Sequence, residues 1–324
     1  TGTPVHVGKI SDSASTLLSN PKGNVVQGRY MYVADTNGDG VEILDVSDPT
    51  RPSHVGSIAS SSAGTTGNLV YLNGADRMVL QGRYLYITED AGDQSQDGVE
   101  ILDISDPANP RHVGSITDTA STRLNLPIGV AIRGHYLYVV SSSESGLEIV
   151  DVADPANPKH AGSIGDGTPE LNNASHVKVQ GKYAYVTGTS DDGFEIVDIS
   201  DPTNPRHAGL LADTAQTALD GAYDVAVAGS YAYVTGSIDD GVEVINVSNP
   251  SNPQHVAAIF DDTRTLLNNA QVIVLQGTRA YVAGLTDNGI EVLEISGLAV
   301  PAANIGSLAG SSVDGWQNVN VAGA

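Results

Sequence analysis

A 19-residue segment recurs through the whole chain, and this repetition constrains the fold more than any other feature of the sequence. The first copy, GVEILDVSDPTRPSHVGSI, spans residues 40–58, and further copies begin at residues 98, 146, 193, 241 and 289. Asp45 and its counterparts Asp103, Asp151, Asp198, Asn246 and Glu294 are separated by 58, 48, 47, 48 and 48 residues. A repeat of about 48 residues, which is the usual spacing between copies, is a supersecondary unit that buries its apolar faces only against neighbouring units. We therefore expect one domain over residues 1–324.

Each repeat contains four short segments with the β-branched and aromatic alternation of strands. They are exemplified by NVVQG (24–28), RYMYV (29–33), VEILDV (41–46) and RHVGSI (111–116). The first two meet at a glycine, a turn rich in Asp, Asn and Gly leads to the third, and the prolines of SDPxNP break the ladder before the fourth. A longer polar loop then begins the next repeat. This order predicts an all-β fold, a β-propeller with six complete four-stranded antiparallel blades over residues 24–308.

The two ends carry further strand-like segments. PVHVGKI (4–10) has the pattern of a fourth, outer strand, so residues 1–10 are expected to form an extra outer strand; WQNVNVAGA (316–324) has the pattern of a first, inner strand. The two segments either begin and finish an abbreviated seventh blade, or pair with a neighbouring subunit by strand addition. Closure as six blades with stray ends is the remaining alternative. Self-association through the terminal strands is therefore a prediction.

The segments LEIVDVADP (147–155) and FEIVDISDP (194–202) resemble the signature of the LVIVD-repeat family, and the resemblance covers six repeats. It implies a bacterial or archaeal secreted or cell-surface propeller. It thus implies an architecture and an extracellular or cell-surface location, and no particular chemistry. The opening TGTPVHVGKI lacks the basic and apolar regions of a signal peptide, so a signal peptide is expected to have been removed.

Composition excludes several classes of partner. The formal charge is −23, with 15 Lys and Arg against 38 Asp and Glu, which opposes binding to nucleic acid or to an anionic membrane. No run approaches 18 apolar residues, so no membrane insertion is expected. The chain has no cysteine, which removes disulfides, thiol catalysis and cysteine metal sites together.

Three polar positions recur in the repeat and are predicted to be structural. Equivalent positions on neighbouring blades lie at least roughly 10 Å apart, too far to share one metal ion or one substrate. The glutamates are expected to bond to the backbone or to neighbouring tyrosines, and the Asp45 set to tie down the proline turn. The sets are His6, His54, His112, His160, His207 and His255; Glu42, Glu100, Glu148, Glu195, Glu243 and Glu291; and the aspartates given above.

Only the first strands converge on the axis, and one position in them varies while its surroundings repeat. The residue five places before each hairpin glycine is Gly23, Arg77, Gly129, His176, Asp224, Val272 or Asn318. Arg77, His176 and Asp224 are therefore candidates to bind an anionic or sugar ligand at the channel mouth, with ordinary solvated channel lining as the alternative.

Two further motifs are incomplete or common by chance. Asp35, Asn37 and Asp39 spell the first half of a calcium loop, but the twelfth position is Val46 instead of Glu, so a hairpin turn is favoured over a calcium site. Asp90, Asp93 and Asp97 form a second calcium candidate of the same kind. Asn173-Ala174-Ser175 is a glycosylation sequon.

The catalytic signatures G-x-S-x-G, H-E-x-x-H, the P-loop and G-x-G-x-x-G are missing from the sequence. We therefore predict a protein that is not an enzyme, a structural or interaction module outside the cell that self-assembles into a filament or surface array. No cofactor is predicted apart from a possible calcium ion. The alternative is a carbohydrate-binding protein or propeller enzyme that works at the channel mouth around Arg77, His176 and Asp224.

Overall fold

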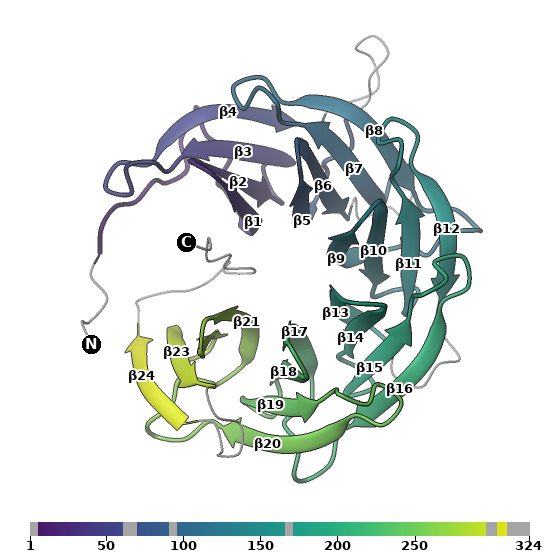
Figure 1. Cartoon of the computed structure of the whole chain (residues 1–324). Helices are drawn as coiled ribbons and strands as arrows, with labels where there is room; N and C mark the ends of the chain where they lie inside the picture. Colours follow the sequence, from purple (N-terminus) through teal and green to yellow (C-terminus); the bar gives the residue numbers. More distant parts are fainter. Residues whose placement is uncertain (1–5, 61–69, 91–95, 166–170, 296–302, 310–324) are drawn as a thin grey trace.

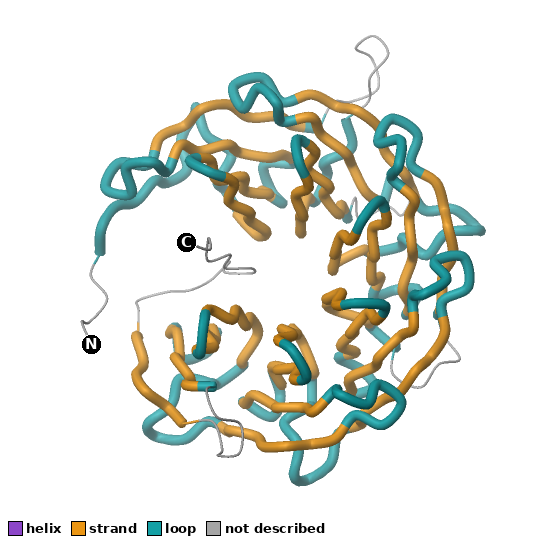
Figure 2. The backbone as a smooth tube through the Cα atoms, in the orientation of Figure 1, coloured by secondary structure: helices purple, strands orange, loops and turns teal. Residues whose placement is uncertain are grey.

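The computed structural model describes residues 6–60, 70–90, 96–165, 171–295 and 303–309. These residues form strands and loops, and no helix occurs among them (Figure 2). Twenty-four strands are arranged in six four-stranded sheets, each built from four strands in chain order. All strand pairs within the sheets are antiparallel, as in β1–β2 and β2–β3.

The strands of the six sheets, here called blades 1 to 6, are β1 (Pro21–Gln27), β2 (Tyr30–Asp35), β3 (Gly40–Asp45) and β4 (Ser53–Ala59); β5 (Ala75–Gln81), β6 (Tyr84–Glu89), β7 (Gly98–Asp103) and β8 (Arg111–Thr117); β9 (Pro127–Arg133), β10 (Tyr136–Ser141), β11 (Gly146–Asp151) and β12 (Lys159–Ile164); β13 (Ala174–Gln180), β14 (Tyr183–Gly188), β15 (Gly193–Asp198) and β16 (Arg206–Ala212); β17 (Ala222–Ala228), β18 (Tyr231–Gly236), β19 (Gly241–Asn246) and β20 (Gln254–Phe260); β21 (Ala270–Gln276), β22 (Arg279–Gly284), β23 (Gly289–Glu294) and β24 (Ala303–Ala309).

The blades stand around a common axis, with β1, β5, β9, β13, β17 and β21 innermost and the fourth strand of each blade outermost (Figure 1). The first two strands of each blade are joined by a tight hairpin, as where Tyr136 of β10 pairs with Arg133 of β9. Gly134 has φ +64° in this turn, a conformation that glycine adopts at little cost. The predicted all-β propeller with six complete blades is confirmed.

Apolar residues on both faces of each blade build the core between neighbouring blades. Between blades 1 and 2, for example, Tyr32 and Ile43 pack with Leu72 and Leu85, and all four are at most 1% exposed. Five such clusters join the six blades in chain order. No cluster among the described residues joins blade 6 to blade 1, and Figure 1 shows an open sector between these two blades.

A hydrogen bond between turns connects each pair of packed blades. Asp240, at the end of the β18–β19 turn, accepts a hydrogen bond through Oδ1 from the Asn269 backbone N–H in the following crossover, at 2.7 Å. The same bond recurs at the other four junctions, from Gly74 to Asp39, Leu126 to Asp97, Asn173 to Ser145 and Gly221 to Asp192. The acidic turns therefore hold neighbouring blades in register.

Replacing Asp240 by alanine is expected to lower the free energy of unfolding by about 2 kcal/mol. The change removes the acceptor for a backbone N–H and puts alanine at φ +54°, a left-handed conformation that Asp and Asn tolerate better than Ala because their side chains hydrogen-bond locally. Urea denaturation followed by circular dichroism measures the effect. Asp240→Asn keeps an acceptor and tolerates this φ, so it should stay close to the wild type; equal loss in both variants would contradict the role of the bond.

Residues 6–10, before blade 1, lie where an outer strand would lie, but they are not in a strand, although one was predicted over 4–10. Nevertheless, a β-carbon on Gly8 would overlap the Pro49 carbonyl oxygen. The glycines of four outer strands lie in the same way against the proline turn of the next blade, in the pairs Gly56–Pro107, Gly114–Pro155, Gly162–Pro202 and Gly209–Pro250. Residues 6–8 thus occupy the outer-strand place of a blade preceding blade 1, and no described residue pairs with them as a ladder partner. The predicted inner strand at 316–324 lies outside the described residues.

Candidate functional site

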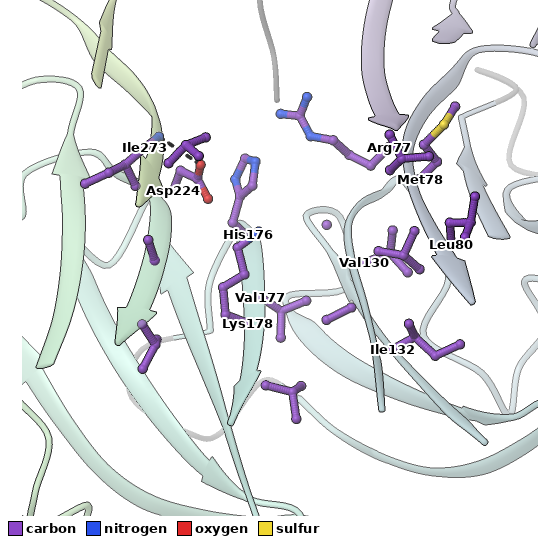
Figure 3. Close-up of a pocket in the computed structure, with 18 of the residues that line it drawn as sticks. Arg77, Met78, Leu80, Val130, Ile132, His176, Val177, Lys178, Asp224 and Ile273 are labelled. Carbon is purple, nitrogen blue, oxygen red and sulfur yellow. Dashed lines mark hydrogen bonds between the residues drawn. The ribbon is translucent and has the colours of Figure 1, made fainter. Parts of the chain in front are cut away.

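A cavity of about 720 Å³ lies on the axis, lined by the first strands of all six blades. Aliphatic residues such as Val130, Ile132, Val177 and Ile273 alternate with polar ones along its wall (Figure 3). Lys178 and Gln180 add polar groups to the wall.

The structure brings the three predicted channel residues to this one cavity. Arg77 comes from blade 2, His176 from blade 4 and Asp224 from blade 5, and they are 3%, 4% and 2% exposed. Figure 3 shows the three side chains at one end of the cavity, with the Arg77 guanidinium and the His176 imidazole turned towards the open centre. All three side chains are buried and border the same cavity; ligand binding by them stays a prediction, as does the alternative of ordinary channel lining.

A local irregularity of the first strand presents each of these residues. The pairing register shifts at this point, as between Ala174 and His176 of β13. A threonine of the second strand accepts a hydrogen bond from the backbone N–H of each residue: Thr88 from Arg77 at 3.1 Å, Thr187 from His176 at 3.2 Å and Thr235 from Asp224 at 3.0 Å. The three other blades have Ala34, Val140 and Ala283 at the threonine position, where the channel residue is glycine or valine. The three polar residues and their threonines therefore occur together.

His176 is a buried imidazole without a hydrogen-bond partner in the described part of the chain. Neither Nδ1 nor Nε2 has one, and the ring stacks at a tilt on Tyr223 with 5.0 Å between centroids. The nearby Tyr223 carbonyl already accepts hydrogen bonds from the hydroxyls of Ser175 and Thr187, both at 2.6 Å. Burial lowers the pKa of His176 to about 3, against the opposing effect of Asp224. The ring is therefore neutral at physiological pH, with one nitrogen able to donate and the other able to accept.

Asp224 and Arg77 place opposite charges beside this ring. The Asp224 carboxylate accepts backbone hydrogen bonds from Val225 at 2.8 Å and from Ile273 at 3.1 Å. The Arg77 guanidinium lies 3.5 Å from the Asp76 carboxylate and also hydrogen-bonds with the Tyr223 hydroxyl, whose pKa is raised by burial. Tyr223 was not predicted from the sequence. The signal was present, since the equivalent positions hold Lys22, Asp76, Ile128, Ser175 and Gln271, and only blade 5 has an aromatic residue there.

In five blades the recurring histidine of the fourth strand forms a hydrogen bond with the recurring glutamate of the third strand. His255 Nδ1 lies 2.6 Å from Glu243 Oε1, and His207 Nδ1 lies 3.1 Å from Glu195 Oε1. The second carboxylate oxygen accepts a backbone N–H of the preceding crossover, as from Ala218 to Glu243. The predicted bonds to the backbone are present, but the side-chain partner is the histidine of the adjacent strand instead of a tyrosine. The Asp45 set caps the proline turn as predicted, with Ser47 N donating to Asp45 Oδ1 at 2.9 Å.

The predicted calcium residues have other roles in the structure. Both Asp35 oxygens accept backbone hydrogen bonds, from Ser19 and Asn20, and Asn37 and Asp39 are exposed. No group of three or more acidic or histidine side chains among the described residues could hold a metal ion. Asp90 and Asp97 are described, but Asp93 lies outside the described residues. Asn173 has φ +53°, and its amide donates to Thr189 Oγ1 at 2.7 Å; glycosylation there stays a prediction.

The two blade faces that border the open sector are incompletely buried. On blade 6, Tyr281, Ile290 and Val292 are partly exposed, whereas the equivalent residues of the other blades are buried against the next blade. On blade 1, Leu18 and Met31 are likewise partly exposed, whereas their equivalents are fully buried. The open sector is thus bordered by two apolar faces that have the composition of a blade junction.

Six four-stranded blades in a ring, each made by one repeat, define the class of six-blade β-propellers. The model of the LVIVD repeat matches residues 24–60, 74–118, 128–166, 172–212 and 221–259. The chain therefore belongs to the LVIVD-repeat family. A search of curated proteins finds no match to this sequence.

Solved structures with a similar fold have low sequence identity. A candidate 6-phosphogluconolactonase from Bacteroides fragilis is 14% identical, with a TM-score of 0.71 over 94% of this chain and 88% of that chain. The periplasmic gluconolactonase of Pseudomonas aeruginosa is also 14% identical, with a TM-score of 0.69 over 91% and 87%. A functionally unknown protein from Desulfotomaculum acetoxidans, 14% identical, has a TM-score of 0.64 over 86% and 80%. At these identities the likeness concerns the fold. Separately, the described residues contain no helix with the length and apolar character needed to cross a bilayer.

Proposed function

We propose that this protein is a non-enzymatic extracellular or cell-surface interaction module that associates with copies of itself at the open sector between blades 6 and 1. The observation that carries the proposal is the pair of partly exposed apolar faces, with Ile290 and Val292 on one side and Leu18 and Met31 on the other. The same strand positions are buried at every junction between neighbouring blades 1 to 6. Covering them removes apolar surface from water, which favours association.

The chain itself carries the segments that suit this sector. Residues 6–8 already lie against the proline turn of blade 1 as an outer strand would, and their backbone edge pairs with no strand in the described part of the chain. The sequence of residues 316–324 has the pattern of an inner strand that ends at Gly323. The middle two strands of a four-stranded blade have no counterpart in these segments. Strand pairing with a second copy would supply ladder partners for the unpaired edges.

This association joins unlike surfaces, because the terminal segments differ from the blade faces that receive them. Such a heterologous contact closes into a ring or propagates as an open filament. A filament or surface array is the form that agrees best with the family resemblance to cell-surface propellers. The high negative charge keeps single copies soluble and favours assembly at raised ionic strength.

Deletion of residues 1–10 or of residues 316–324 tests the proposal. Each deletion is expected to abolish assembly, as seen by electron microscopy of the purified protein, while the β-sheet circular dichroism of a folded propeller remains. Assembly that survives both deletions would refute a role for the terminal segments.

A second candidate function is small-molecule binding or hydrolysis in the axial cavity. The unpartnered buried imidazole of His176 favours it, and the gluconolactonase named among the similar folds suggests a sugar-acid lactone or another carbohydrate as the ligand. Hydrolysis of glucono-δ-lactone, followed by acid release at constant pH, tests the catalytic form. A rate equal to that of buffer, or an unchanged rate in His176→Phe, would exclude it.

A further inference from the structure

The polar end of the axial cavity presents three kinds of group to a ligand. Arg77 supplies a cation, Asp224 an anion and His176 a neutral ring, and they come from three different blades. The two cations at this end, Arg77 and Lys178, are matched by two carboxylates, Asp224 and the Asp76 that lies beside Arg77. A ligand at this end therefore meets separate positive and negative groups.

The hydrogen-bonding needs of His176 and Asp224 are those that a hydroxyl group satisfies. A neutral imidazole offers one donor and one acceptor, and both His176 nitrogens lack a partner in the described chain. The Asp224 carboxylate accepts two backbone N–H groups, which leaves lone pairs for a further donor. A hydroxyl can donate to the Asp224 carboxylate and accept from the N–H of the His176 ring. Buried polar groups of native proteins are normally paired, so the unpaired ring indicates a missing polar partner.

Arg77 suits a second group on a ligand that binds here, a carboxylate. Its guanidinium faces the open centre (Figure 3), beside the Tyr223 hydroxyl with which it hydrogen-bonds and the Asp76 carboxylate at 3.5 Å; a guanidinium has five N–H donors and can bind a ligand in addition to these groups. A guanidinium binds a carboxylate with two parallel hydrogen bonds. The carboxylate of a ligand on the axis would therefore lie against Arg77, within reach of the positive field of Lys178.

The rest of the cavity limits the size and the body of the ligand. A volume of about 720 Å³ lies within the usual range of small-molecule sites. Aliphatic residues such as Ile132 and Val179 border the cavity beside the polar groups of Lys178 and Gln180, a mixture that suits a short carbon chain with polar substituents.

We propose that the axial cavity binds a small hydroxycarboxylate of the sugar-acid type, with its carboxylate on Arg77 and a hydroxyl group between His176 and Asp224. The proposal rests on the second candidate function and names its ligand class. It requires neither hydrolysis nor self-association.

Isothermal titration calorimetry of the full chain with three probes tests the ligand class. Gluconate carries both required groups, glucose lacks the carboxylate and hexanoate lacks the hydroxyls. Gluconate is expected to bind at least tenfold more tightly than either of the others. If gluconate binds no more tightly than glucose, or no more tightly than hexanoate, the proposal is overturned.

Variants of the protein then test which side chain binds the carboxylate and which binds the hydroxyl of the ligand. Arg77→Gln should reduce gluconate affinity at least tenfold, to the level of glucose, while Arg133→Gln removes an exposed arginine of a neighbouring first strand and should change nothing. His176→Phe keeps an aromatic ring on Tyr223 and should weaken gluconate but not hexanoate. Equal affinity in Arg77→Gln and Arg133→Gln overturns the proposed carboxylate site. Melting curves verify folding, and the three-probe comparison on the wild type stands even if a variant does not fold.

These outcomes separate the proposals. Gluconate binding without lactone hydrolysis would leave the ligand class in place and exclude the catalytic form of the second candidate function. Assembly seen by electron microscopy is independent of both results.

Discussion

Replacing Gly162 by valine is expected to lower the free energy of unfolding by about 3 kcal/mol. A β-carbon at this position of β12 would lie 2.5 Å from the Pro202 carbonyl oxygen of the next blade, so one of the two backbones must move. Overpacking of this kind costs on the order of 1–3 kcal/mol, and more where backbone atoms collide. Urea denaturation of the full chain measures the effect.

Gly8→Val provides the matched comparison. Gly8 lies in the equivalent contact with Pro49, but its segment is held by no strand pairing. Valine there should displace residues 6–10 from blade 1 with little change in the unfolding transition of the six blades. If Gly162→Val unfolds at the same urea concentration as the wild type, close packing of the outer strand on the proline turn is not what fixes the blade spacing.

Replacing His160 by alanine is expected to destabilise the protein by about 2 kcal/mol at pH 8, and by less at pH 5. The change removes the partner of the fully buried Glu148 carboxylate. A buried carboxylate that loses a hydrogen-bond partner costs about 1–3 kcal/mol, and because His160 is itself 38% exposed, water can partly replace the imidazole. Thermal unfolding at the two pH values measures the difference.

The sign of the pH dependence follows from the pKa of the carboxyl group. Burial raises the pKa of Glu148 to about 7, against the opposing hydrogen bond from His160. The folded state therefore favours the protonated acid, and this stability is lost as the pH rises from about 4.5 through 7. Glu100, Glu243 and Glu291 also have a pKa raised to about 7, chiefly by burial, so the wild type should melt at a higher temperature at pH 5 than at pH 8. Without His160, the loss between pH 5 and pH 8 should be larger; a smaller loss in the variant would contradict the pairing.

The repeat made the blade architecture predictable, because its glycines, turns and alternating residues each specify one local geometry and all agree. The role of the acidic turns was not predictable in the same way. Asp39 belongs to a sequence that matches half of a calcium loop, but its acceptor oxygen binds the Gly74 N–H of the next blade. This contact depends on how blades pack against each other, which a pattern within one repeat does not contain.

The candidate site was predictable only in part. Convergence of Arg77, His176 and Asp224 followed from the variable position in the inner strand. The unpartnered state of His176 and the contribution of Tyr223 did not, because both depend on how the inner strands of neighbouring blades 4 and 5 pack at the axis. Thr88, Thr187 and Thr235 were a readable signal, since a polar residue in the second strand accompanies each polar channel residue.

Sedimentation velocity of the full chain over a range of concentrations tests self-association at the open sector most directly. The comparison is between Ile290→Asn, at the partly exposed face of blade 6, and Ile238→Asn, at an isoleucine that is 65% exposed in the β18–β19 turn. The wild type and Ile238→Asn should form large species as concentration rises, whereas Ile290→Asn should sediment as a folded monomer throughout. Large species in Ile290→Asn at the wild-type concentration, or a wild type that stays monomeric, would contradict association through this sector.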